Sequence, residues 1–238
     1  MKITALIPAK QKSERVPNKN IKFFNGYPLI ENKVRQLLKS KIINRVVVGT
    51  NSNQIKKILN KYDIDIVDRE SDYCGTLDNR DTFTANDMIY DLSSKVKSDI
   101  SIWVHCTNPL VDSEIYDQAL KKFFENEKNK KFDSLASVDK LQGHFFNKKF
   151  QVINYNPYAK RHKLAPEIDS YFVLNGAFFI QRHKTMIKNR YFFGKKPYLF
   201  EVPINKSVDI NYPEDFKLAK YYLSQNRNWI VKLKFKKN

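Results

Sequence analysis

Short apolar runs rich in valine and isoleucine alternate with segments of helical periodicity along most of the chain, and this alternation constrains the fold most. The runs predict strands at Ile3 to Pro8, Arg45 to Gly49, Ile64 to Val67, Ile100 to His105 and Ser134 to Val138. Strands that alternate with helices form a mostly parallel sheet with right-handed crossovers and helices on both faces. The sequence therefore predicts a three-layer, Rossmann-like α/β fold that binds ligands at the carboxyl ends of its strands.

The segments between the predicted strands carry the signals of helix starts. Helices are expected at Leu29 to Leu38, from Asn51 or Ser52 to about Lys61, from about Phe83 to Lys95, and from about Ser113 to Asn126, with Asp112 or Ser113 as N-cap of the last. Pro213 suits the first turn of a terminal helix that reaches about Ser224.

The stretch after Val138 breaks the alternation. It is rich in aromatic and basic residues without a helical period, and strand-like segments follow at Tyr171 to Ile180 and Ser207 to Ile210. We predict an inserted arm at about residues 140–170 that lacks a closed core of its own. A dimer surface is favoured over a segment that folds across the sheet.

The last residues form a basic tail. Val231, Leu233 and Phe235 alternate with lysines, which favours an edge strand over a weak contact with a membrane surface. We expect one domain over residues 1–226 and a separate tail over residues 227–238.

Length and composition indicate an ordinary globular chain. Its 238 residues can enclose one sizeable core, and its apolar runs are too short to cross a bilayer. Cys74 and Cys106 provide neither a disulfide framework nor a metal-site spacing. The start of the chain lacks a small-residue cleavage site. A soluble cytoplasmic protein without stable membrane insertion is expected.

The formal net charge of +18 allows three interpretations. The lysines are scattered, which favours a compositional bias on solvated faces. The alternative is a positive active-site mouth for polyanionic substrates. Nucleic-acid binding comes third and no such partner is expected, because the sequence contains none of the corresponding motifs.

The loop after the first predicted strand is the first candidate for a functional site. The stretch IPAKQKSERVPNKN, Ile7 to Asn20, lacks glycine and therefore cannot form a glycine-rich phosphate cradle. It offers Lys10, Lys12, Arg15 and Lys19 around Ser13, a set that can hold a triphosphate through cationic side chains and backbone N–H groups. Spacing alone leaves this interpretation even with that of an exposed basic loop.

Several motifs in order resemble those of the acylneuraminate cytidylyltransferases and the related 3-deoxy-manno-octulosonate cytidylyltransferases. The first strand ends in Ile7-Pro8-Ala9-Lys10, where the family has I-P-A-R, and Ser13 and Lys19 follow. Ser13-Glu14-Arg15-Val16-Pro17 is similar to the octulosonate branch, and Lys19-Asn20 to the sialate branch. The remaining matches are Pro28-Leu29-Ile30, Thr50-Asn51-Ser52, Arg69, Thr107-Asn108-Pro109-Leu110, Arg161, Asn175-Gly176-Ala177 and Val208-Asp209-Ile210.

The resemblance implies a nucleotide site at the first loop. It places Ala9, Lys10, Ser13, Arg15, Lys19 and Arg69 around CTP. Lys19 is expected nearest the α-phosphate, and Lys19, Arg15 and Asp209 are the candidate catalytic residues. Viewed alone, Arg69 would be read as a surface residue.

The resemblance also implies an acceptor site for an acidic sugar. Its candidate residues are His105, Thr107, Arg161 and Asn175, with Arg161 paired to the sugar carboxylate. Phe178 and Phe179 are candidates for an apolar wall, or else for the core. Val111 departs from the sialate branch, which often has arginine after P-L.

A divalent metal is expected at Asp209 and Asn211, where the family often has Asp-x-Asp. Residues two apart in a strand face the same way, so both side chains should point to one site. Mg²⁺ takes one or two protein carboxylates and completes its octahedron with substrate oxygens and water. The alternative is that Asp209 caps the helix that begins near Pro213.

The expected function is transfer of CMP from CTP to an acidic sugar of the nonulosonate or octulosonate type, with release of pyrophosphate, for surface glycan synthesis. The enzyme is expected to be a homodimer that uses Mg²⁺. A nucleotidyltransferase of the same fold with another acceptor and a catalytically weakened binding protein are the alternatives.

Overall fold

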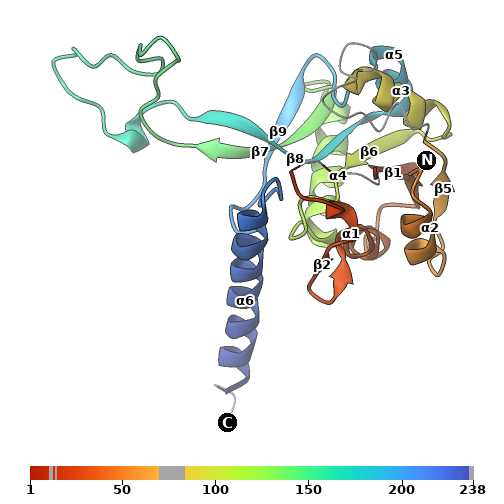
Figure 1. Ribbon diagram of the computed structural model, residues 1–238. Helices are drawn as coiled ribbons and strands as arrows, with labels where there is room; N and C mark the ends of the chain where they lie inside the picture. The colour runs from red at the N-terminus through yellow and green to blue at the C-terminus, as the bar shows by residue number, and fades with distance from the viewer. Residues whose placement is uncertain (11–12, 14, 70–83, 236–238) are drawn as a thin grey trace.

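In the computed structural model, residues 1–10, 13, 15–69 and 84–235 are described, with side chains up to residue 225. Lys12 and Cys74 lie outside the described residues. The centre is a seven-stranded sheet in the order β5-β4-β1-β6-β8-β7-β9 (Figure 1). Its strands are β1 (Ile3–Pro8), β4 (Arg45–Gly49), β5 (Asp65–Val67), β6 (Ile100–Val104), β7 (Ser134–Leu141), β8 (Tyr171–Arg182) and β9 (Pro197–Glu201). All neighbouring pairs are parallel except those of β8, which is antiparallel to β6 and β7.

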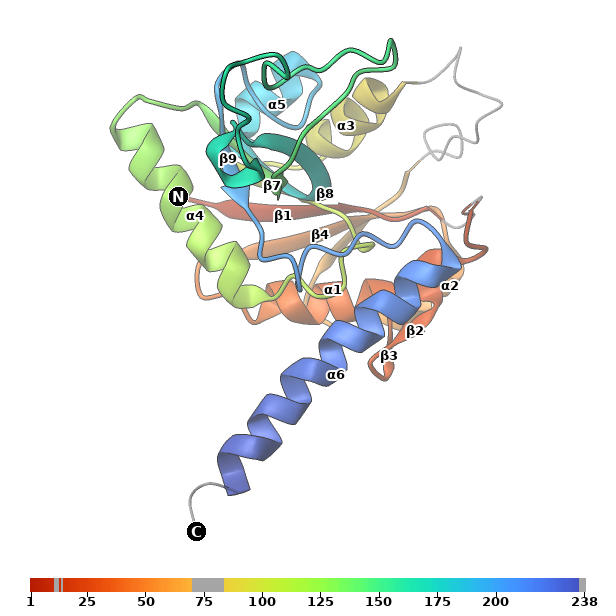
Figure 2. The same cartoon turned by 90° about the vertical axis from the view of Figure 1, so that its left-hand side faces the viewer.

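Helices cover both faces of this sheet. On one face lie α1 (Leu29–Leu38), α2 (Asn53–Leu59) and α4 (Ser113–Lys128), and on the other lie α3 (Ala85–Ser94) and α5 (His183–Asn189) (Figure 2). Each face has its own apolar cluster. Leu37, Ile55 and Phe123 belong to the first, whereas Leu92 and Met186 belong to the second. The expected three-layer α/β fold is confirmed.

Two of the predicted helix starts are confirmed. Ser52 accepts a hydrogen bond from the Ile55 N–H at the start of α2, and Asp112 accepts one from the Ile115 N–H at the start of α4. Thr84 and Asp87 form a reciprocal capping box at the start of α3. These side chains satisfy backbone N–H groups that a helix leaves without intrahelical partners.

The second half of the chain differs from the prediction at two places. Ser207 to Ile210 is not a strand, and the edge of the sheet is instead β9, which pairs in parallel with β7. The backbone N–H of Ile210 in this segment donates to the Thr107 carbonyl at 2.8 Å. The apolar alternation of residues 207–210 resembles that of a strand, but the segment forms no ladder with any of the described strands.

The prediction of an edge strand in the tail is wrong. Helix α6 (Pro213–Phe235) continues through the alternating lysines. The sequence after Pro213 contains neither glycine nor proline, the two residues that most disfavour a helix, so nothing of that kind ends α6 before the tail. Figure 1 shows α6 leaving the body of the molecule.

The arm is a two-stranded extension of β7 and β8. The pairs from Val138–Leu174 to Leu141–Tyr171 lie beyond the reach of β6, and residues 142–170 connect the two strands. This connection contains one bridge, Phe146 to Val152, and the 3₁₀ helix η4 (Ala165–Glu167). Figure 1 shows the arm projecting from the body. Within the described part of the chain, no helix combines the length and hydropathy needed to span a membrane.

Candidate active site

Lys19 joins the loop after β1 to a segment almost two hundred residues later. It opens the short 3₁₀ helix η1 (Lys19–Ile21), which follows Asn18 in a left-handed conformation with φ of 54°. Its Nζ donates to the Ile210 carbonyl at 2.6 Å. Burial lowers the pKa of Lys19, whereas the charge of Asp209 acts in the opposite direction, and Arg15 and Lys10 add to the lowering. Lys19 therefore lies among the other loop cations and beside an acid.

A second contact links the same two segments. The Arg15 guanidinium lies 5.4 Å from the centroid of the Tyr212 ring, a distance at which a cation is attracted to an aromatic face. The loop cations Arg15 and Lys19 thus face the segment from Asp209 to Tyr212. The structure brings these predicted catalytic residues together.

The other predicted nucleotide residues lie along the carboxyl edge of β1, β4 and β5. The buried Ala9 donates its N–H to Gly49 at 2.9 Å, and the Lys10 carbonyl accepts from Asn20 at 3.0 Å. Ser13 is half-buried. Arg69 is buried, so the interpretation of Arg69 as a surface residue is wrong. A Cβ on Gly49 would lie 2.8 Å from Leu92 Cδ1 and 3.1 Å from Arg69 Cδ, so glycine is required for this packing.

Asp209 and Asn211 contact each other directly, although they do not lie in a strand. Asn211 Nδ2 donates to Asp209 Oδ2 at 2.6 Å. Asp209 Oδ1 is buried and has no hydrogen-bond partner among the described residues. Asp215 Oδ2 accepts from the N–H groups of Asn211 and Tyr212, both at 2.7 Å. Asp215, rather than Asp209, therefore satisfies the backbone before α6.

A cavity of about 460 Å³ opens beside Asp209. Its walls come from the start of the arm, from the segment before α6 and from α6 itself. The lining residues are Asp139, Leu174, Asn175, Ile204, Ser207, Val208, Asp209, Asn211, Asp215, Leu218 and Tyr222. Carboxylates and amides thus share this cavity with aliphatic side chains.

Thr107 and Asn175 hold the cavity walls in place. The Thr107 carbonyl accepts from the Ile210 N–H, next to Asp209. The buried Asn175 donates from Nδ2 to Asp139 at 3.0 Å, and its Oδ1 accepts from the Ser137 hydroxyl at 2.7 Å. Both ends of the Asn175 amide therefore have protein partners.

His105 also has protein partners at both ring nitrogens. Trp103 Nε1 donates to Nε2 at 3.1 Å, so Nδ1 carries the proton and donates to the Gly176 carbonyl at 2.6 Å. Burial lowers the pKa of His105. The ring is thus a neutral imidazole, and a sugar hydroxyl would have to compete with one of these two bonds.

Aromatic rings surround His105 on one face of the sheet. The Phe192 ring meets His105 edge-on at 6.1 Å and stacks on Phe179 at 4.8 Å. Phe178 points to the opposite face and packs against Tyr116 at 5.3 Å. Of the two phenylalanines considered for an apolar wall, only Phe179 therefore lies beside His105, and Phe178 belongs to the core.

Arg161 is not brought to the other site residues. It lies in the arm, with 79% of its side chain exposed, and forms an ion pair with Glu167 of the same arm. Its pairing with a substrate carboxylate stays a prediction.

Three residues that the structure places at the site had no role assigned to them from the sequence, although Asn108 lies within the Thr107-Asn108-Pro109-Leu110 match. Asp139 and Asp215 line the cavity. Asn108 Nδ2 donates to the Asn175 carbonyl at 3.1 Å and so connects the end of β6 to β8. Asp139 lies one residue beyond the predicted end of its strand, and Asp215 reads as an ordinary acid in a first helical turn.

A cationic loop that faces an acid at the carboxyl edge of a parallel sheet defines a nucleotide-binding α/β protein. The family model described as "Cytidylyltransferase" matches residues 4–234. The chain belongs to the cytidylyltransferase family, whose members are nucleotidyltransferases.

Named relatives fall into two groups by coverage. The pseudaminic acid cytidylyltransferase of Campylobacter jejuni is 25% identical over 95% of this chain and 98% of its own. The CMP-N,N'-diacetyllegionaminic acid synthase of Legionella pneumophila is 25% identical over 97% and 100%. The 3-deoxy-manno-octulosonate cytidylyltransferase of Chlorobium phaeobacteroides is 33% identical, but over only 52% of this chain and 47% of its own.

Solved structures show the same fold. A CMP:2-keto-3-deoxy-manno-octonic acid synthetase complexed with CTP superposes with a TM-score of 0.65 at 14% identity, covering 95% of this chain and 100% of that one. A 4-diphosphocytidyl-2C-methyl-D-erythritol synthase from Anaerococcus prevotii also has a TM-score of 0.65, at 13% identity, covering 94% and 98%.

Replacement of Lys19 by alanine is expected to lower turnover by about 100-fold or more, because the half-buried ammonium faces the position expected for the phosphates. Steady-state pyrophosphate release and thermal unfolding are to be measured on the same preparations. Lys22→Ala, three residues away with an exposed side chain, is the matched control and should keep near-normal turnover. Near-normal turnover in Lys19→Ala would contradict the assignment of this loop.

Proposed function

We propose that this protein transfers CMP from CTP to a nonulosonic acid, with release of pyrophosphate. The observation that carries the proposal is the meeting of Arg15 and Lys19 with the segment that contains Asp209, at the ligand-binding edge of a cytidylyltransferase-family fold. CTP brings up to four negative charges and the acceptor one more, so a site that gathers both needs several cations. The product is an activated sugar for glycan synthesis.

The choice of a nonulosonic acid rests on coverage. The pseudaminic and legionaminic relatives align along nearly their whole length, whereas the octulosonate relatives align over about half.

The reaction is an in-line displacement at the α-phosphorus. The anomeric hydroxyl oxygen of the sugar forms the new bond to phosphorus and gives up its proton to water. The bond from phosphorus to the bridging oxygen breaks, and pyrophosphate leaves with that electron pair. Lys19 and Arg15 neutralise charge on the phosphates and align the nucleotide, which supplies most of the rate in reactions of this kind. His105 takes no part in proton transfer, since Trp103 and the Gly176 carbonyl engage both of its ring nitrogens.

Asp209 is suited to hold Mg²⁺. Its Oδ1 is buried without a hydrogen-bond partner among the described residues, the state expected of an oxygen that awaits a hard cation. Substrate oxygens and water would fill the rest of the coordination shell of a bound Mg²⁺. When bound, Mg²⁺ supplies charge stabilisation to the phosphates. Asn211 orients the carboxylate through Oδ2.

We further propose a homodimer that acts in the cytoplasm, where CTP is made. Four consecutive residues of the arm, from Tyr171 to Leu174, are between 39% and 46% exposed although all are apolar. A two-stranded ribbon that leaves apolar side chains uncovered on both faces is marginal alone and suits a protein interface.

A substrate panel tests the proposed reaction. CTP with N-acetylneuraminic, pseudaminic, legionaminic or 3-deoxy-manno-octulosonic acid is compared with ATP, GTP and UTP by pyrophosphate release. CTP with one of the nine-carbon acids should exceed every other pair by at least about 100-fold in kcat/KM. Equal turnover of the four nucleotides would sink the cytidylyl assignment, preference for the eight-carbon acid would overturn the acceptor, and no turnover at all would favour a binding protein.

Substitutions at the Asp209–Asn211 pair test the metal proposal. Asp209→Asn should abolish Mg²⁺-dependent pyrophosphate release, whereas Asn211→Asp should lower the Mg²⁺ concentration needed, since it adds a second carboxylate. Without metal, Asn211→Asp places like charges together, so Mg²⁺ should raise the melting temperature of this variant more than that of wild type. An active Asp209→Asn with an unchanged Mg²⁺ requirement in Asn211→Asp would exclude this pair as the metal site.

The dimer proposal is tested by light scattering. Wild type should have twice the mass of one chain, and Phe172→Asp should shift it towards the monomer, because a charge enters the apolar face of the arm. Phe172 lies opposite Lys140 in the strand pair, so the new carboxylate has a partner in the monomer and folding should be preserved. Lys148→Asp, on the exposed connection of the arm, is the control and should leave the mass unchanged. A dimeric Phe172→Asp would remove the arm from the interface.

A further inference from the structure

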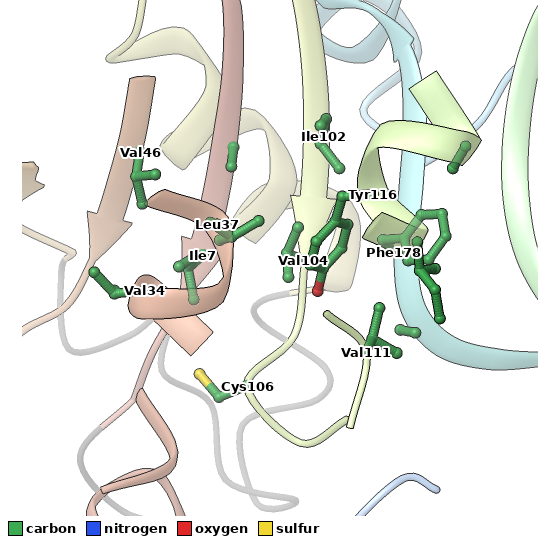
Figure 3. Packing of buried hydrophobic residues seen from close by; sticks show 14 of the residues in the cluster. Ile7, Val34, Leu37, Val46, Ile102, Val104, Cys106, Val111, Tyr116 and Phe178 are labelled. Atoms are coloured by element: carbon green, nitrogen blue, oxygen red, sulfur yellow. The ribbon is translucent and has the colours of Figure 1, made fainter. Parts of the chain in front are cut away.

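A lysine in the core is the most unusual charged group outside the site. Lys33 of α1 is fully buried, and its Nζ donates to the carbonyls of Asn108 at 2.9 Å and Val111 at 3.1 Å and to the Tyr116 hydroxyl at 2.9 Å. An ammonium has three N–H donors, so these three acceptors use all of them. Figure 3 shows Tyr116 between Val104 and Phe178 within the apolar core.

The buried ammonium is costly to maintain. Burial lowers the pKa of Lys33 to about 7, because an apolar surrounding disfavours the charged form. An aliphatic residue would fill the same place in the core without that cost. What the lysine provides that an aliphatic residue would not is a set of three donated hydrogen bonds. Two of their three acceptors belong to the loop after β6.

Neighbouring residues of α1 hold the same loop. Asn32 Nδ2 donates to the Pro109 carbonyl at 3.0 Å, and Gln36 Nε2 donates to the same oxygen at 2.7 Å. With Lys33, three side chains of one helix therefore fix the carbonyls of Asn108, Pro109 and Val111. We call this loop, residues 107–111, the β6 loop.

The other side of the β6 loop carries the walls of the active site. Its Thr107 carbonyl accepts from the Ile210 N–H, and the Ile210 carbonyl accepts from Lys19. Asn108 Nδ2 donates to the Asn175 carbonyl. Hydrogen bonds thus connect α1 through the β6 loop to Ile210, which is next to Asp209, and to Asn175 in the cavity wall.

We propose that Lys33 is a positioning residue, which fixes the β6 loop and through it the placement of Asp209 relative to Lys19. It touches neither substrate, since it is fully enclosed by protein. The kinetic part of this proposal rests on the proposed function, whereas the structural part does not.

The test compares Lys33→Met, which keeps the volume of the stem and removes the donors, with two controls. Leu37→Ala lies one turn along α1 in the apolar core and has no hydrogen bond to lose. Tyr116→Phe removes one acceptor of Lys33 and leaves both loop carbonyls bonded. Hydrogen exchange of peptides that cover residues 207–212 and pyrophosphate release with CTP and the preferred sugar are measured well below each melting temperature.

Lys33→Met should exchange at least about 10-fold faster than wild type in residues 207–212 and lose roughly 10- to 100-fold in kcat, because a small displacement of a reacting group has an effect of that size. Leu37→Ala should lower the melting temperature without either change, and Tyr116→Phe should stay close to wild type. Wild-type exchange in Lys33→Met, or equal effects in Leu37→Ala, would overturn the proposal and leave Lys33 a core residue.

A second variant covers a folding failure. If Lys33→Met does not fold, Lys33→Gln is measured instead. Its amide has two N–H donors on a shorter side chain and cannot serve all three acceptors, so exchange in residues 207–212 should again exceed that of wild type, by a smaller factor, and wild-type exchange would overturn the proposal. If no sugar supports turnover, the proposed function fails, but exchange in residues 207–212 still decides whether Lys33 positions this segment.

Discussion

The hydrogen bond from Lys19 to the Ile210 carbonyl is the contact on which the site depends, because it joins the first loop of the chain to the segment before its last helix. A cationic loop alone is a solvated surface, and an acid alone repels a nucleotide. Together, the Lys19 ammonium, the Arg15 guanidinium and the Asp209 carboxylate lie in one region, because Lys19 and Arg15 both contact the segment that contains Asp209. The parallel sheet makes this possible, since it aligns the carboxyl ends of β1, β4 and β6 along one edge.

The sequence predicts the first two thirds of the fold because periodicity there agrees with local capping. Ser52 and Asp112 are N-caps as their positions indicated, and the central strands β1, β4 and β6 are buried along almost their whole length. Agreement between levels of this kind is typical of a sequence that specifies one structure. The later elements were harder to predict, since β9 is a half-exposed edge strand and the alternation near Val231 lies within a helix. Periodicity cannot reveal whether a strand partner exists.

The site was predicted in part, and the failures have a physical reason. Lys19, Arg15, Asp209 and Asn211 come together, yet the strand that was expected to orient the last two does not form. A hydrogen bond between the side chains brings them together instead. Asp139, Asp215 and Lys33 carry no local signal, because their importance arises from contacts with residues far away in the chain. Lysine in a helix reads as a surface residue, and only the structure shows that α1 turns it inward.

The pairing of one carboxylate with one amide at the site has an electrostatic consequence. In the absence of a metal, two adjacent carboxylates repel each other, so one of them gains a proton or moves away. Asn211 avoids this, since its amide donates to Asp209 Oδ2 and leaves Oδ1 directed by the protein before any cation binds. The same substitution removes one negative charge that would oppose the nucleotide. Arg15 and Lys19 face the segment that carries this pair, and the charge of Asp209 acts on Lys19, so the cationic loop and the acid form one electrostatic unit rather than two separate sites.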